Sequence, residues 1–149
     1  MQLSELIQRD VITCTNRDSL ARAAQLMWEH DIGCLPITGD DGRVVGVLTD
    51  RDIAMAGYIQ GAPLRSIAIS SVMCREPVTC QETDDLRQLQ RIMMDRQIRR
   101  VPVVDAQGLP VGIVTVNDIA RAAAAGRLAA GELASTICAI NRPRVSRAA

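Results

Sequence analysis

The sequence predicts a mixed α/β (α+β) fold built from two similar halves that pack face to face. The main observation is an internal repeat, because the stretch Gly-Val-Leu-Thr-Asp-Arg-Asp-Ile-Ala at 46–54 returns as Gly-Ile-Val-Thr-Val-Asn-Asp-Ile-Ala at 112–120. The same offset of 66 positions aligns Ser4 with Ser70, Thr13 with Thr79, Asp18 with Asp84, Pro36 with Pro102 and Gly42 with Gly108. In both halves, strand-like apolar runs alternate with stretches of helical spacing. These observations indicate an internal duplication.

The first half follows the order helix, strand, helix, strand, hairpin, strand, helix. In chain order we expect a helix over 4–9, a strand over 11–14, a helix over 19–30, strands over 34–37 and 44–48 on either side of a turn at 39–42, and a helix over 50–58. Ser4 is the expected N-cap of the first helix. Pro36 cannot donate a hydrogen bond to a neighbouring strand, so we expect its strand at a sheet edge or paired on one side only.

The second half repeats this order. We expect a helix over 70–75, a strand over 78–80, a helix over 85–96, strands over 100–104 and 111–114, and a helix over 116–125. The Ala-rich stretch 120–140 predicts two consecutive helices, followed by a frayed basic tail that begins at Asn141. The domain division that we expect is a first repeat over 1–60, a connector over 61–69, a second repeat over 70–125 and a helical extension with its tail over 126–149.

The composition argues against several classes of function. The formal net charge is zero, with 17 charged residues of each sign, so no overall field attracts nucleic acid or anionic lipid. One Trp, one Tyr and no Phe provide few platforms for stacking nucleic-acid bases. We expect a cytoplasmic protein, because the N-terminus lacks a signal-peptide pattern and no apolar run reaches the roughly 18 residues of a membrane span. Five cysteines without CxxC spacing are typical of buried reduced thiols.

Two Thr-x-x-Asp motifs, Thr49 to Asp52 and Thr115 to Asp118, stand at the predicted strand-to-helix junctions. Their structural interpretation is a capping box, in which a Thr and an acid three residues later satisfy the first amides of a helix. Their functional interpretation is a nucleotide site. Helix N-terminal amides suit a phosphate, and an Asp one turn later can accept hydrogen bonds from ribose hydroxyls. The recurrence of both Thr and Asp is more restrictive than capping requires, which favours the nucleotide site.

With these motifs, the chain resembles a tandem pair of CBS domains, the arrangement often called a Bateman module. The resemblance covers about residues 4–54 and 70–121 and includes both Gly-apolar-apolar-Thr-x-x-Asp signatures and the strands with Pro36 and Pro102. The chain is most similar to small stand-alone bacterial proteins with two CBS domains, including the hypoxic-response type. The resemblance implies two β-α-β-β-α repeats packed through their sheets with pseudo-two-fold symmetry. It also implies two related clefts for an adenosyl ligand: AMP, ADP, ATP or S-adenosylmethionine.

The resemblance assigns roles to residues by position. Asp52 and Asp118 would hold ribose, and Thr49 and Thr115 would hold phosphate or ribose oxygens. The residues that would flank the adenine, through backbone groups and apolar contact, are Ile12, Thr13, Leu35, Val78, Thr79 and Val101.

Charged side chains near these motifs are further candidates. Arg51 could neutralise a phosphate, whereas the second repeat has Asn117 in its place and suits a polyphosphate less well. Arg99 and Arg100 either reach an anionic ligand or form a solvated pair. His30, the only histidine, is expected to interact with the dipole at the end of its helix rather than with a ligand. No nucleophile with a neighbouring base and no Walker loop is present in the sequence, so we expect no enzyme.

We therefore expect a non-enzymatic sensor with no obligatory cofactor, which forms a homodimer and signals to a regulated protein. Contact with nucleic acid or membrane is not expected. Two alternatives stay open. The first is a structural or scaffolding dimer with vestigial clefts, in which Thr and Asp serve only as caps. The second is a thiol redox or metal sensor, because Cys14 and Cys80 occupy equivalent positions.

Overall fold

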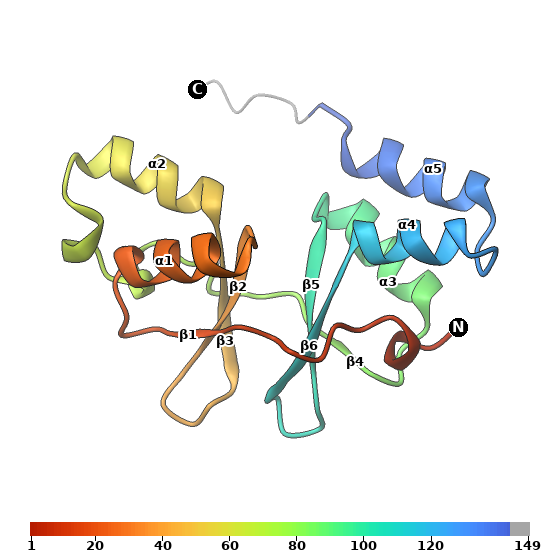
Figure 1. The fold of residues 1–149 in the computed structure, drawn as a ribbon, viewed down its shortest axis with the longest axis horizontal. Coiled ribbons are helices and arrows are strands. Elements are labelled where there is room, and N and C mark those ends of the chain that lie inside the picture. Colours follow the sequence, from red (N-terminus) through yellow and green to blue (C-terminus); the bar gives the residue numbers. More distant parts are fainter. Residues whose placement is uncertain (144–149) are drawn as a thin grey trace.

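The computed structural model describes residues 1–143 as two similar halves that lie side by side (Figure 1). The first half contains β1 (Cys14–Thr15), α1 (Leu20–His30), β2 (Cys34–Thr38), β3 (Val44–Thr49) and α2 (Asp50–Gln60). The second half contains β4 (Cys80–Gln81), α3 (Leu86–Arg96), β5 (Arg100–Val104), β6 (Pro110–Thr115), α4 (Val116–Ala124) and α5 (Ala130–Ile140). The predicted mixed fold of two similar halves is confirmed. Part of the predicted basic tail, residues 144–149, lies outside the described residues.

Each half has a three-stranded sheet with the same topology. β2 lies between β1, which is parallel to it, and β3, which is antiparallel, and β5 lies in the same way between β4 and β6. The strand of Pro36 is therefore central rather than at an edge. Pro36 is tolerated there because β1 pairs only with Ile37 and Thr38, while Pro36 pairs with Val47 of β3. Pairing on one side only, the second expectation, describes this residue.

Two of the expected short helices are shorter and begin earlier than predicted. The segment 4–9 forms only the 3₁₀ turn η1 (Leu3–Glu5), and its N-cap is Gln2 rather than Ser4. The segment 70–75 forms the 3₁₀ turn η3 (Ile69–Ser71), which follows another turn, η2 (Leu64–Ser66). The physical reason is burial: Leu3 and Ile69 are fully buried, and each one anchors its turn to a core.

The segments that precede β1 and β4 are exchanged between the halves. The chain begins beside the second half, where Leu3 packs in the core, and then crosses to β1 of the first half (Figure 1). The segment around Ile69 packs in the core of the first half before the chain crosses to β4. The first turn of the chain thus completes the second core, and the connector completes the first.

Backbone hydrogen bonds fix both crossings. Gln8 pairs with Ile113 of β6, with N···O distances of 3.3 Å in both directions. Cys74 pairs with Val47 of β3, at 3.0 and 3.2 Å. The two contacts are equivalent at the 66-residue offset, so the halves exchange the same interaction and are related by a pseudo-two-fold axis.

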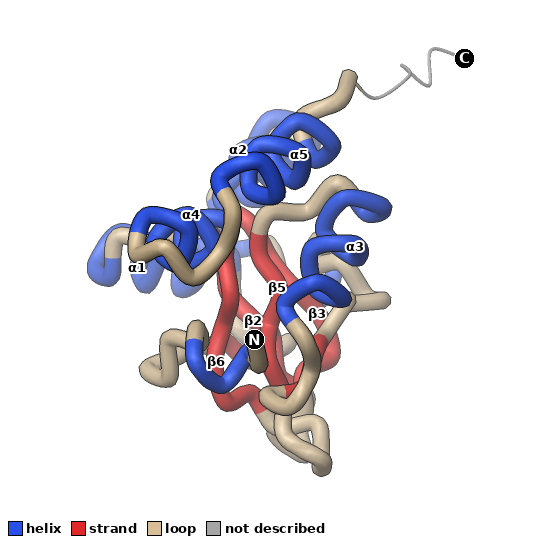
Figure 2. Tube along the Cα trace, turned by 90° about the vertical axis from the view of Figure 1, so that its right-hand side faces the viewer, coloured by secondary structure: helices blue, strands red, loops and turns tan. Residues whose placement is uncertain are grey.

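Helices cover both sides of the strands, with α3 on one side and α4 on the other (Figure 2). The helix α5 packs against α3 and α4, where Gln90 Nε2 donates to Thr136 Oγ1 at 2.9 Å in a buried contact. Within residues 1–143 the first half has no counterpart of α5, and its helices leave Trp28 88% and Tyr58 82% exposed. None of the helices in this part of the chain is long and apolar enough to cross a membrane.

Candidate ligand-binding site

Both Thr-x-x-Asp motifs form complete capping boxes where a strand runs into a helix. At the junction of β3 and α2, Thr49 Oγ1 accepts from the Asp52 amide at 3.2 Å, and Asp52 Oδ2 accepts from the Thr49 amide and hydroxyl at 2.8 Å each. At the junction of β6 and α4, the distances for Thr115 and Asp118 are 3.3 Å and twice 2.7 Å. The capping interpretation is thus confirmed at both junctions. The capping hydrogen bonds use only one oxygen, Oδ2, of each aspartate carboxylate.

The other oxygen of Asp52 is free within the described residues. No donor among residues 1–143 lies within hydrogen-bonding distance of Asp52 Oδ1, and the side chain is partly exposed. A carboxylate offers about four lone-pair positions, of which the cap takes two here. The remaining positions lie in the first turn of α2, where the amides of Asp50, Arg51 and Asp52 already donate to the Gly33 carbonyl oxygen, Asp50 Oδ1 and Thr49 Oγ1. This junction therefore presents an open carboxylate acceptor at the start of a helix.

The equivalent oxygen of Asp118 is occupied. Gln8 Nε2, from the segment that crosses β6, donates to Asp118 Oδ1 at 2.8 Å. Arg121, one turn further along α4, also donates to Asp118 Oδ1 and forms an ion pair with it. The Asp118 side chain is only 2% exposed. With two donors on each oxygen, the carboxylate has no acceptor position left for a ligand.

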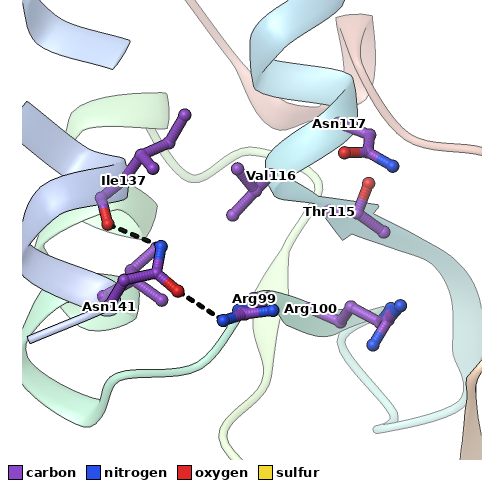
Figure 3. Close-up of a pocket in the computed structure, with 8 residues that line it drawn as sticks. Arg99, Arg100, Thr115, Val116, Asn117, Ile137 and Asn141 are labelled. Carbon is purple, nitrogen blue, oxygen red and sulfur yellow. Dashed lines mark hydrogen bonds between the residues drawn. The ribbon is translucent and has the colours of Figure 1, made fainter. Parts of the chain in front are cut away.

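A pocket of about 260 Å³ lies in front of the second junction. Its lining comes from the start of β5, the junction of β6 and α4, and the C-terminal end of α5 (Figure 3). The lining residues are Arg99, Arg100, Thr115, Val116, Asn117, Ile137, Ile140 and Asn141. Arg99 donates to the side chain of Asn141, which in turn donates to the Ile137 carbonyl oxygen at 2.8 Å. The pocket thus joins cationic side chains to a helix N-terminus, a combination that suits an anionic group.

The two arginines at the start of β5, Arg99 just before the strand and Arg100 its first residue, face in different directions. Arg99 turns toward α5, whereas Arg100 points away from it (Figure 3). A Cβ atom added at Gly33 would lie 3.4 Å from Arg100 Nη2 and 2.7 Å from Asp50 Oδ2. Arg100 therefore reaches across to the first half, beside the first turn of α2. Both arginines are exposed, and both line the pocket, so the two interpretations of this pair stay open.

The remaining candidate residues are dispersed. Leu35 and Val101 are fully buried in the two cores, so only their backbone could meet a ligand. Ile12 and Val78 pack against the same cores, and Thr13 is partly buried beside β1. Thr79 lines a second pocket, of about 340 Å³, that is formed mainly by the hairpin turns Arg43–Val44 and Asp105–Gly108. Arg51 is exposed at the start of α2.

The cysteines form no disulfide, and residues 1–143 contain no group of three or more Cys, His, Asp and Glu side chains placed to hold a metal ion. Burial raises the pKa of the Cys14, Cys34 and Cys80 thiols from 9.0 to about 11. These thiols are un-ionised at neutral pH, and the thiol form is a poor nucleophile and metal ligand. Cys74 and Cys138 are exposed.

Gln8 and Arg121 were not identified from the sequence as site residues. Gln8 is separated from Asp118 by 110 positions, and only the exchanged path of the N-terminal segment brings them together. Arg121 stands three residues after Asp118, a spacing at which ion pairs form on a helix, so this contact had a local signal. The residues of α5 that close the pocket have no equivalent in the first repeat.

Comparison with known proteins identifies the family. The sequence model described as the CBS domain matches residues 3–58 and 69–125. The chain is 42% identical over 112 residues to Hypoxic response protein 1 of Mycobacterium tuberculosis, and the match covers 74% of this chain and 77% of that protein.

Solved structures agree with this match. The CBS domain pair of protein MJ0100, in complex with 5′-methylthioadenosine and S-adenosyl-L-methionine, has a TM-score of 0.76 and 31% identity over 85% of this chain and 98% of that chain. Hypoxic Response Protein I with two coordinated zinc ions has a TM-score of 0.74 and 36% identity over 81% of this chain and 98% of that chain. The chain therefore belongs to the CBS domain family, as a tandem pair of its domains.

Proposed function

We propose that this tandem pair of CBS domains is a non-enzymatic regulatory module that binds an adenosyl ligand: AMP, ADP, ATP or S-adenosylmethionine. The observation that carries the proposal is the junction at Thr49, where Asp52 Oδ1 receives no hydrogen bond from residues 1–143 and stands in the first turn of α2. Two vicinal ribose hydroxyls need such an acceptor. The 31% identical MJ0100 pair, which was solved with two adenosyl compounds, supports the same ligand class.

Two guanidinium groups near the start of α2 could offset the acids Asp50 and Asp52 there and meet the anionic end of such a ligand. Arg51 is exposed in the first turn of α2, and Arg100 reaches the same region from the second half. Either guanidinium could pair with a phosphate or a carboxylate, adding to the favourable end of the helix dipole. Thr49 would contribute its hydroxyl. The adenine would lie along Ile12 and Thr13 and the backbone of Leu35.

By the same positions, a ligand at the second junction would meet Thr115, Val78, Thr79 and the backbone of Val101. It would reach Asp118 only where Gln8 and Arg121 release that carboxylate. Its pocket already combines Arg99 and Arg100 with the N-terminus of α4, which suits an anionic group. Asn117 stands where the first copy has Arg51, so this junction provides one cation fewer in the first turn of its helix.

The regulatory output is part of the proposal. A ligand that bridges groups of both halves favours the conformation in which those groups are close, and a regulated protein reads that surface. We propose a homodimer in the cytoplasm. The exposed Trp28, Tyr58 and Ile59 on α1 and α2 supply apolar surface for the dimer, and the free thiols fit a reducing compartment.

Thermal unfolding tests the ligand proposal. The purified chain is heated alone and with an excess of S-adenosylmethionine, 5′-methylthioadenosine, AMP, ADP, ATP or NAD. At one hundred times its dissociation constant, a ligand adds about 2.7 kcal/mol and raises the melting temperature by about 5–10 °C. The shift should disappear in Asp52→Ala, while Asp95→Ala, an exposed acid on α3, should keep it. The absence of a shift with every adenosyl compound would overturn the proposal.

The structural alternative has an observation of its own, because both capping boxes are complete without a ligand. In a purely structural dimer, Asp52→Ala would lower the melting temperature of the free chain and no nucleotide would change it. The metal-sensor alternative is tested by adding zinc chloride to the same experiment, because the 36% identical Hypoxic Response Protein I holds two zinc ions. A zinc-dependent shift in the absence of nucleotide would favour it.

A further inference from the structure

The Asp residues in the two copies of the motif differ in the hydrogen-bond donors that already bind their carboxylate oxygens. Each uses Oδ2 for its own helix cap, at 2.7–2.8 Å. Asp52 Oδ1 has no donor among the described residues, whereas Asp118 Oδ1 receives both Gln8 and Arg121. The repeated motif alone would give both aspartates the same hydrogen bonds. The difference at Oδ1 therefore comes from the residues that face the two aspartates.

Those facing residues differ between the copies at the 66-residue offset. The position equivalent to Gln8 is Cys74, whose thiol lies 3.7 Å from the Glu76 carbonyl oxygen and cannot replace an amide donor on Asp52. The position equivalent to Arg121 is Met55, which has no donor. Only the second copy therefore carries side chains that occupy its aspartate.

The segment that carries Gln8 is docked on the second half by several contacts. Leu3 is fully buried there, the amino group of Met1 lies 3.1 Å from Asp85 Oδ2, and Arg9 pairs with Glu82 at 2.8 Å. Gln8 itself is exposed apart from its contact, and the Arg121 side chain is 64% exposed. Two exposed side chains, one on a docked segment and one on a helix, thus cover an aspartate whose side chain is 2% exposed.

We infer that Gln8, with Arg121, acts as an internal occupant of the second site and excludes the ribose of an adenosyl ligand from Asp118. The inference rests on the proposed function and specifies its stoichiometry. The Asp52 site binds one adenosyl ligand per chain. The Asp118 site accepts a second one only when the Gln8 amide leaves Oδ1, so a ligand there competes with the docked N-terminal segment.

Isothermal titration with S-adenosyl-L-methionine, and separately with AMP, tests the inference. We expect one site per wild-type chain. The variant Gln8→Ala/Arg121→Ala should show a second site, or at least a tenfold gain in affinity at a weak second site. Cys74→Ala, the equivalent substitution in the first copy, should keep one site. In the double variant, a further Asp52→Ala should remove one site and leave the other.

The outcomes separate this inference from the proposed function. Two equal sites in the wild-type chain would overturn the inference and leave adenosyl binding intact. So would a single site in the double variant that is lost with Asp52→Ala. Binding of neither compound to any of these proteins would overturn both. Circular dichroism of each variant confirms folding, and the single variant Arg121→Ala, altered at an exposed side chain, should give an intermediate gain if the double variant is unstable.

Discussion

Gly46 of β3 lies directly against the backbone of Cys74, so that a Cβ atom added at Gly46 would stand 2.8 Å from the Cys74 carbonyl oxygen. The same relation holds in the other half, where a Cβ at Gly112 would stand 2.8 Å from the Gln8 carbonyl oxygen. The glycine that opens each Gly-apolar-apolar-Thr-x-x-Asp signature therefore allows the exchanged segment to cross the strand. It has a packing role that is separate from the Thr and Asp.

Substitution of these glycines should destabilise the fold. Gly46→Ala and Gly112→Ala would each force a backbone carbonyl to move, which typically costs about 1–3 kcal/mol of unfolding free energy. Urea denaturation measures this loss. Gly131→Ala is the control, because a Cβ there meets nothing within 4 Å and alanine in the first turn of α5 should not lower the unfolding free energy. Equal unfolding free energies for Gly46→Ala and the wild type would contradict the close contact between Gly46 and the Cys74 backbone.

Much of this arrangement follows from the sequence. The duplication predicted two similar halves, and the motif at Thr49 predicted its capping box together with its place between a strand and a helix. The local sequence pattern could not predict that the segments preceding β1 and β4 are exchanged between the halves. Leu3 contributes to a core whose strands begin some eighty residues later. The inequality of Asp52 and Asp118 was missed for the same reason, since it depends on Gln8, a distant residue.

The two aspartates should contribute unequally to stability without any ligand. Asp118 accepts four hydrogen bonds and is buried, whereas Asp52 accepts two and is partly exposed. We expect Asp118→Ala to lower the unfolding free energy by about 2–3 kcal/mol and Asp52→Ala by about 1 kcal/mol. Chemical denaturation of the free proteins gives both values. A larger loss for Asp52→Ala than for Asp118→Ala would contradict the assignment of contacts.

The buried thiols should make the fold sensitive to high pH. Burial raises the pKa of Cys14, Cys34 and Cys80 in the native state to about 11, so the native protein keeps protons that the unfolded chain loses above pH 9. The unfolding free energy therefore falls as the pH rises from 9 to 11. The chain has no lysine to titrate in this window. Urea midpoints at several pH values should show the fall, and Cys80→Ala should reduce it. A flat profile would contradict these pKa shifts.

The exposed apolar side chains of α1 and α2 should control dimerisation. Trp28 and Tyr58 are 88% and 82% exposed in the single chain, and large aromatic residues often dominate interface energies. We expect Trp28→Ser to weaken the dimer at least tenfold in light scattering across a dilution series. His30→Ala, at an exposed neighbour on the same helix, should have no effect. A dimer of unchanged affinity in Trp28→Ser and Tyr58→Ser would place the interface elsewhere.

The most direct test of ligand binding at the junction of Thr49 and Asp52 is the response of individual backbone amides to an adenosyl compound. In the ¹⁵N-labelled wild-type chain, saturating S-adenosyl-L-methionine or AMP should shift the amide resonances of Thr49–Asp52 and of Ile12 and Thr13. The amides of Thr115–Asp118 should stay in place, because Gln8 and Arg121 occupy Asp118. If neither compound shifts the resonances of Thr49–Asp52, this junction is a helix cap and not a binding site.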